Sequence, residues 1–209
     1  AARSQPFAVH PCSAVWSSVC INDMKKRLLF LGPPGAGKGT QAELLAAAHN
    51  LLHLSTGDLL RAEVAAGTSL GMEAEAVMAS GALVSDELVL AIVRSRLETQ
   101  AASDGGGWLL DGFPRNLAQA EALGQLLEEL HQPIELVVLL ELDDAVLLQR
   151  LLGRGRADDN ESVIRHRLEV YREQTAPLIR YYREAALLQS VEAHGTVDTI
   201  AARITDLLA

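Results

Sequence analysis

Short apolar runs and helix-forming stretches alternate along this chain of 209 residues. We expect strands at residues 25–31, 51–56, 108–111, 135–142 and 188–192, of which the runs at 25–31 and 135–142 have the pattern of strands buried on both faces. The stretches between and after these runs predict helices at residues 41–48, 59–66, 70–79, 85–97, 116–130, 145–152, 161–187 with a break at Pro177, and 197–208. Strands that alternate with helices in this way predict an α/β fold with a doubly wound, parallel, five-stranded sheet.

The segment GPPGAGKGT, residues 32–40, lies between the first apolar run and the first helix. Its glycines lack a Cβ, so backbone N–H groups can converge on a phosphate, and the following helix adds its positive end. Lys38 supplies a mobile point charge. A chance glycine turn before a helix is the alternative, but strand, turn and helix in this order favour a P-loop, which we call the phosphate cradle.

The composition narrows the class of protein. Hydrophobic residues make up 49% and charged residues 22%, which is typical of a soluble globular protein. The net charge of −9 argues against a nucleic-acid partner, and the lack of an apolar run of about 18 residues argues against a membrane span. Because Cys12 and Cys20 both precede the first strand, they cannot staple the core, and a reducing, cytoplasmic location is expected.

Residues 1–23 lack periodicity and are rich in Ser and Ala, so we place them outside a domain that spans residues 24–209. They are either a vector or upstream-translated remnant or the end of an organelle transit peptide. The second possibility would move the protein to a plastid or another organelle.

Asp111 ends the third apolar run and is followed by Gly-Phe-Pro-Arg, with Gln119 four residues after Arg115. A lone buried carboxylate is costly, so its position makes sense if it faces Mg²⁺ directly or through water. Gly112 and Pro114 shape a turn that aims Arg115 at a phosphate. An ordinary helix-start turn is the alternative for this segment.

Two further segments do not indicate a nucleotide site when each is taken alone. In residues 55–61, STGDLLR, the Thr56 hydroxyl could bind a ribose or base, but an ordinary capped helix that carries an arginine explains the segment equally well. An arginine cluster, formed by Arg150, Arg154 and Arg156 with Arg167 on the next helix, is either a solvated surface or a site for several negative charges.

Together these segments resemble the nucleoside monophosphate kinases, and among them the adenylate kinase family. The resemblance rests on three motifs: the cradle form GxPGxGKGT, in which Gly39 separates Lys38 from Thr40; DGFPR; and RGRADDN followed by Arg167. It covers residue 25 to the end and implies the reversible, Mg²⁺-dependent conversion of ATP and AMP to ADP by a monomer. Thr56 favours AMP, because relatives that prefer UMP or CMP usually carry alanine there.

The resemblance also implies a role for each site residue. Catalysis would involve Lys38, Asp111, Arg115, Arg156 and Arg167, with Asp111 holding Mg²⁺ through water. ATP would contact Gly35, Ala36, Gly37, Lys38, Gly39, Thr40, Arg150, Arg154 and Gly195. AMP would contact Thr56, Arg61, Ala82, Leu83, Val84, Gly112, Phe113, Pro114, Arg115, Gln119, Arg156 and Arg167.

Two insertions are expected to close on the substrates: an NMP-binding insertion at residues 55–84 and a short lid at residues 153–160. The short lid has no cysteine pairs, so we expect no zinc. Two other functions stay open at this point. One is a UMP/CMP kinase on the same scaffold, and the other is a nucleotide sensor that has no catalytic activity.

Overall fold

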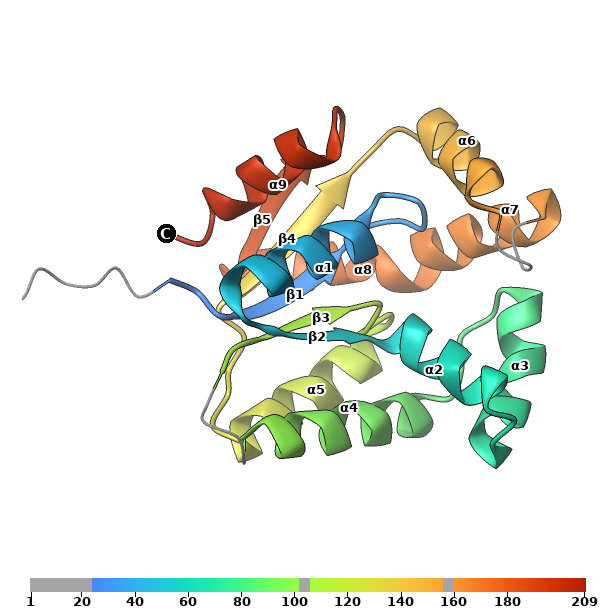
Figure 1. The fold of residues 1–209 in the computed structure, drawn as a ribbon, viewed down its shortest axis with the longest axis horizontal. Coiled ribbons are helices and arrows are strands. Elements are labelled where there is room, and N and C mark those ends of the chain that lie inside the picture. The colour runs from blue at the N-terminus through green and yellow to red at the C-terminus, as the bar shows by residue number, and fades with distance from the viewer. Residues whose placement is uncertain (1–23, 102–105, 156–159) are drawn as a thin grey trace, which may run out of the picture.

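The computed structural model describes residues 24–101, 106–155 and 160–209 (Figure 1). Its centre is a five-stranded parallel sheet in the order β2-β3-β1-β4-β5. The strands are β1 (Arg27–Leu31), β2 (Leu52–Ser55), β3 (Trp108–Asp111), β4 (Leu136–Glu141) and β5 (Leu188–Glu192). Each predicted apolar run contains one strand, and the predicted α/β, doubly wound class is confirmed.

Helices cover both faces of this sheet (Figure 1). In the described part of the chain they are α1 (Lys38–His49), α2 (Thr56–Ala65), α3 (Ser69–Ser80), α4 (Asp86–Ala101), α5 (Leu117–Glu129), α6 (Asp144–Arg154), α7 (Glu161–Val170), α8 (Pro177–Glu184) and α9 (Val197–Thr205). Successive residues of β1 point to opposite faces. Leu28 and Phe30 pack in a core with α1 and α9, whereas Leu29 and Leu31 pack with α4, α5 and α8. Burial on both faces explains why the central strands are apolar throughout.

The strand register brings the predicted site segments together at one edge of the sheet. Asp111 at the end of β3 pairs with Ser55 of β2 on one side and with Phe30 of β1 on the other. The cradle follows β1, the STGD segment ends β2, and the DGFPR turn leaves β3. All three therefore meet beyond the carboxyl ends of neighbouring strands, where ligands of such sheets bind.

Several helix boundaries differ from those predicted, and two of them border predicted site segments. α2 begins at Thr56 rather than near residue 59, because Ser55 acts as its N-cap and accepts a hydrogen bond from the Asp58 amide. α6 continues through Gly153, and its last residue is Arg154. Gly155 follows as the C-cap residue in the left-handed conformation, with φ 72°. The loop expected to begin at Gly153 therefore begins at Gly155, and residues 156–159 lie outside the described residues.

The predicted long helix with a break at Pro177 is found as α7, a π-helical turn η1 (Tyr171–Thr175), and α8. The amide of Ala176 donates to the Tyr171 carbonyl, five residues back, at 2.8 Å. Proline has no N–H and its ring crowds the carbonyl four residues earlier, so the wider turn accommodates it without ending the helical path.

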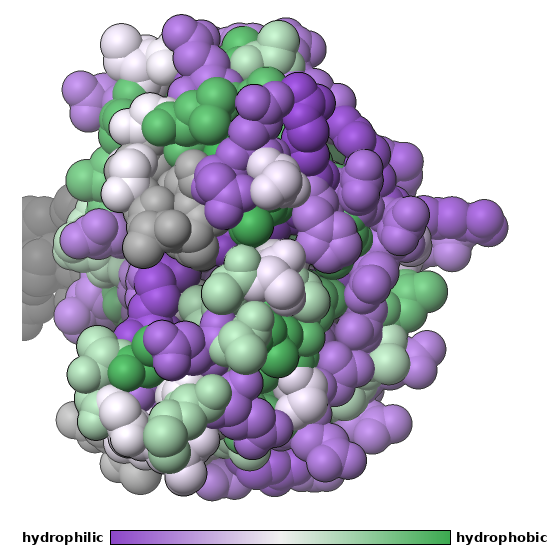
Figure 2. All heavy atoms as spheres, turned by 90° about the vertical axis from the view of Figure 1, so that its right-hand side faces the viewer, coloured by the Kyte–Doolittle hydropathy of each residue, from purple (hydrophilic) through white to green (hydrophobic). Residues whose placement is uncertain are grey.

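Figure 2 shows the side of the molecule nearest to α3 and α7, where hydrophilic residues predominate and hydrophobic ones gather in small groups. Met72 on α3 and Leu152 on α6 are among the large apolar side chains that are exposed. No helix in the described residues combines the length and apolar character needed to cross a membrane.

Candidate functional site

A cleft of about 980 Å³ opens at the carboxyl end of the sheet, within the size range of small-molecule sites. Its walls come from the cradle, the first turn of α2, the segment after α3, the DGFPR turn, α7, η1 and the start of α9. Side chains from segments more than 100 residues apart thus line one cavity.

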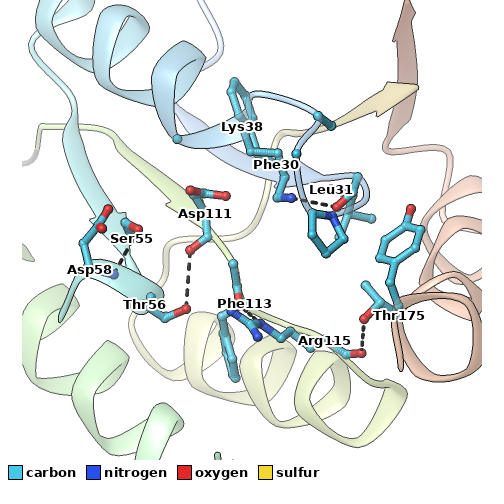
Figure 3. Close-up of a pocket in the computed structure, with 18 of the residues that line it drawn as sticks. Phe30, Leu31, Lys38, Ser55, Thr56, Asp58, Asp111, Phe113, Arg115 and Thr175 are labelled. Atoms are coloured by element: carbon cyan, nitrogen blue, oxygen red, sulfur yellow. Dashed lines mark hydrogen bonds between the residues drawn. The ribbon is translucent and has the colours of Figure 1, made fainter. Parts of the chain in front are cut away.

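The cradle wraps around the start of α1. Gly37 is the N-cap residue with φ 93°, and Gly35 has φ 87°, which favours glycine. A Cβ on Gly35 would lie 2.9 Å from Leu151 Cγ, so a side chain there would displace α6. Lys38 donates through Nζ to the Gly32 carbonyl at 2.7 Å and to the Pro33 carbonyl at 3.1 Å, within the loop. Figure 3 shows its side chain above Asp111 at the cleft. The amides of the first helical turn have no partner within a helix, which makes this an anion site.

Asp111 lies opposite the cradle with 8% of its surface exposed (Figure 3). Its Oδ1 is buried and has no hydrogen-bond partner among the described residues. Its Oδ2 lies 3.4 Å from the point where a Cβ on Gly39 would stand, so the carboxylate faces the start of α1. A buried carboxylate oxygen without a donor is costly, whereas oxygen ligands suit a hard divalent cation. The residue therefore fits Mg²⁺ at the cradle.

Arg115 is held on three sides. Its amide donates to Gln119 Oε1 at 2.6 Å, its Nε donates to the Gly112 carbonyl at 2.7 Å, and its carbonyl accepts from Thr175 Oγ1 at 2.7 Å (Figure 3). The turn that precedes it contains a cis peptide bond between Phe113 and Pro114. These bonds fix the backbone from which the guanidinium extends.

The Arg115 guanidinium is buried among charged side chains of both signs. Burial lowers the pKa of Arg115; nearby Asp111 raises it, and the charges of Arg167 and Arg61 lower it further. Arginine remains charged in proteins, so burial, the largest cause of the lowered pKa, carries a cost that repulsion from Arg167 and Arg61 increases. A bound anion would relieve that repulsion.

Thr56 and Arg61 line the same side of the cleft. Thr56 is 3% exposed, and its Oγ1 donates to the Asp111 carbonyl at 3.5 Å (Figure 3). Arg61 forms an ion pair with Asp58 one turn earlier. The predicted residues Ala82, Leu83, Val84, Gly112, Phe113 and Pro114 line the cleft beside them.

The opposite end of the cleft is formed by α6 and the turn before α9. Arg150 Nη2 donates to the Ala193 carbonyl at 3.2 Å, next to Gly195. Arg167 reaches from α7 across the cleft, where its Nη2 lies 3.3 Å from the Met78 carbonyl at the end of α3. The side chain of Arg154 and the whole of Arg156 lie outside the described residues, so their roles stay predictions.

The cleft also contains residues that the sequence did not indicate, among them Gln41, Tyr171 and Thr175. Gln41 is 2% exposed and donates through Nε2 to the Val197 carbonyl at 2.9 Å, which ties α1 to the start of α9. Thr175 bonds to Arg115, and Tyr171, whose pKa is raised to about 12 by burial and by Glu141, lines the cleft from η1. The one sequence signal for Thr175 and Tyr171 was Pro177, because it marks the irregular turn η1 that carries both residues.

Comparison with known proteins supplies the family. A family model described as adenylate kinase matches residues 30–187, which include the cradle, the DGFPR turn and η1. A protein of Prochlorococcus marinus (strain MIT 9313) named adenylate kinase is 72% identical over 181 residues, covering 87% of this chain and 97% of the relative. A protein of the same name from Synechococcus sp. (strain CC9311) is 69% identical over 186 residues, covering 89% of this chain and all of the relative.

Proposed function

The chain belongs to the adenylate kinase family of nucleoside monophosphate kinases, and on that premise we propose that it converts ATP and AMP reversibly into two molecules of ADP. The observation that carries the proposal is the placement of the phosphate cradle and Arg115 on opposite walls of one cleft. A donor phosphate chain and an acceptor phosphate would meet between them.

On the donor side, the cradle amides and Lys38 would hold the ATP phosphates. In this structure Lys38 donates to carbonyls of its own loop, at 2.7 and 3.1 Å, and phosphate oxygens would replace these acceptors. When bound, Mg²⁺ neutralises charge on the β and γ oxygens, and Asp111 would hold it directly or through water. Asp111 Oδ1, which is buried and has no hydrogen-bond partner in residues 24–101, 106–155 and 160–209, supports this assignment.

On the acceptor side, Arg115 and Arg61 would bind the AMP phosphate, and Arg167 would reach the phosphoryl group in transit. Phosphoryl transfer needs positioning and charge compensation more than covalent chemistry, because its transition state is loose. Preorganised cations of this kind are each worth about 3 kcal/mol of barrier. A phosphate oxygen of AMP is already ionised, so the reaction requires no general base.

Closure of the NMP-binding insertion and the short lid over both substrates is part of the proposal. Water in the cleft would hydrolyse ATP, so the reactive site should assemble only after both nucleotides bind. The contact between Arg167 on α7 and Met78 on α3 supports this, because it joins elements from the two sides of the cleft. We further propose that the protein is a monomer, so sedimentation should show a single species of monomer mass. We also propose that it is located in the cytoplasm.

The nucleotide preference is tested by incubation with Mg-ATP and each of AMP, CMP and UMP, followed by measurement of the diphosphates formed. ADP formed with AMP as the strongly preferred acceptor is the expected result, because Thr56 stands where an alanine would favour pyrimidine nucleotides. Preferred turnover of CMP or UMP would overturn the substrate. Nucleotide binding without turnover of any of the three would indicate a sensor.

A further inference from the structure

Asp86, the first residue of α4, accepts hydrogen bonds from two side-chain amides at the start of α5. Gln119 Nε2 donates to Asp86 Oδ1 at 2.6 Å, and Asn116 Nδ2 lies 3.2 and 3.3 Å from its two carboxylate oxygens. Building on the proposed function, we propose that Asp86 is a positioning residue that orients the Gln119 amide. This orientation makes the acceptor site prefer a 6-aminopurine over a 6-oxopurine.

The neighbours of Gln119 allow its amide one orientation. The Asp86 carboxylate only accepts hydrogen bonds, so the amide nitrogen must face it. The Arg115 main-chain N–H only donates, so the amide oxygen must face that group, at 2.6 Å. A reversed amide would set oxygen against carboxylate and NH₂ against N–H. Because Gln119 is 2% exposed, water could not restore the hydrogen bonds that its own amide would lose.

This orientation leaves one hydrogen-bonding group of each kind available. A primary amide has two N–H donors and an oxygen with two lone pairs, and the protein bonds described above use one of each. Gln119, Val84 and Phe113 all line the cleft. The remaining donor and acceptor match adenine, which presents a 6-amino donor beside the N1 acceptor. Hypoxanthine presents the reverse pair, a 6-oxo acceptor beside an N1–H donor.

Helix capping alone does not account for Asp86. Asn116 Oδ1 accepts from the main-chain N–H of Gln119 at 2.8 Å, and Gln119 Oε1 accepts from the main-chain N–H of Arg115. The two side-chain oxygens therefore cap main-chain N–H groups at the start of α5. Within the part of the chain that the structure describes, the hydrogen bonds of the Asp86 carboxylate come from the side-chain nitrogens of Asn116 and Gln119. Its distinct effect is therefore to hold both amides in one orientation.

Asp86→Asn tests this directly, because asparagine keeps the size of aspartate but can donate as well as accept. Gln119 would then be held in its native orientation by the Arg115 N–H alone, so the reversed orientation would become less unfavourable. We expect the ratio of kcat/KM for AMP to that for IMP to fall about tenfold, mostly through KM, while kcat with AMP changes less than about twofold. Calorimetric titration with AMP and with IMP, without a donor nucleotide, should show the same loss of discrimination.

Glu87→Gln is the matched control, since it removes the same charge from the same turn of α4, and it should leave the ratio unchanged. An unchanged ratio in Asp86→Asn, in a protein whose melting temperature stays close to that of the wild type, would overturn the role of Asp86. An equal fall in both variants would also overturn it, because charge alone would then explain the effect. Failure of the wild type to phosphorylate AMP would instead refute the proposed function.

Discussion

The two walls of the cleft are built on different principles. The donor wall is mostly main chain: the amides of the cradle, the first turn of α1, and Lys38, which rests on the carbonyls of Gly32 and Pro33. The acceptor wall is a network of side chains in which Asp86, Gln119, Arg115 and Thr175 are joined by hydrogen bonds of 2.6 to 2.7 Å. Arg115 itself is fixed before any ligand binds.

This difference indicates how recognition is divided. Main-chain amides and a mobile lysine suit phosphates, which all nucleotides share. An oriented side-chain network suits a base, whose donors and acceptors vary between nucleotides. Changes in the donor wall should therefore reduce turnover for every substrate, and changes in the acceptor wall should act mainly on the affinity for AMP.

Lys38→Met should give the largest effect, a loss of kcat of at least about a hundredfold with every acceptor, because it removes a cation from the transferred phosphates. Lys26→Met, at an exposed position before β1, makes the same chemical change outside the cleft and should retain activity. Steady-state kinetics with saturating Mg-ATP and AMP measure both variants. Wild-type turnover by Lys38→Met would remove the lysine from the mechanism.

Arg167→Ala and Arg165→Ala sharpen the comparison, because the two residues lie on the same helix and only Arg167 lines the cleft. Arg167→Ala should lower kcat about ten- to a hundredfold, through loss of a charge that faces the transferred group. Arg165 is 62% exposed and pairs with Glu161 on the helix surface, so Arg165→Ala should change unfolding free energy by less than about 0.5 kcal/mol and leave kcat intact. Equal losses in the two variants would contradict the assignment.

Thr175→Val should have the smallest effect and should act on the acceptor alone. It leaves the Arg115 carbonyl without its hydroxyl donor, and we expect KM for AMP to rise about three- to tenfold while KM for ATP stays unchanged. Thr205→Val removes a similar bond, to the Ala201 carbonyl at 2.9 Å on the exposed side of α9, and is the control. An equal rise in both KM values would argue against a separate acceptor wall.

Features encoded in contiguous residues were predictable from the sequence. The apolar runs predicted every strand, and the cradle and DGFPR turn were recognised because each is a short segment of fixed spacing. Boundaries were less certain where two signals compete. Gly153 looked like a helix stop, but the left-handed residue that ends α6 is Gly155.

The acceptor network could not be predicted, because its contacts join distant residues. Gln119 and Asp86 are 33 positions apart, and Thr175 and Arg115 are 60 apart. Nothing in the local sequence around Asp86 distinguishes it from an ordinary helix residue, and Pro177 indicates only that the turn that carries Thr175 is irregular. Their roles follow only from the way the sheet and η1 place α4, α5 and the DGFPR turn against one another.

The affinity of AMP for Lys38→Met, measured by calorimetry without ATP, tests the separation of the two walls most directly. AMP should bind this variant within about twofold of the wild-type Kd, although its turnover falls at least about a hundredfold. An AMP affinity that falls in parallel with kcat would show that the two walls act as one site and would contradict the division proposed for the cleft.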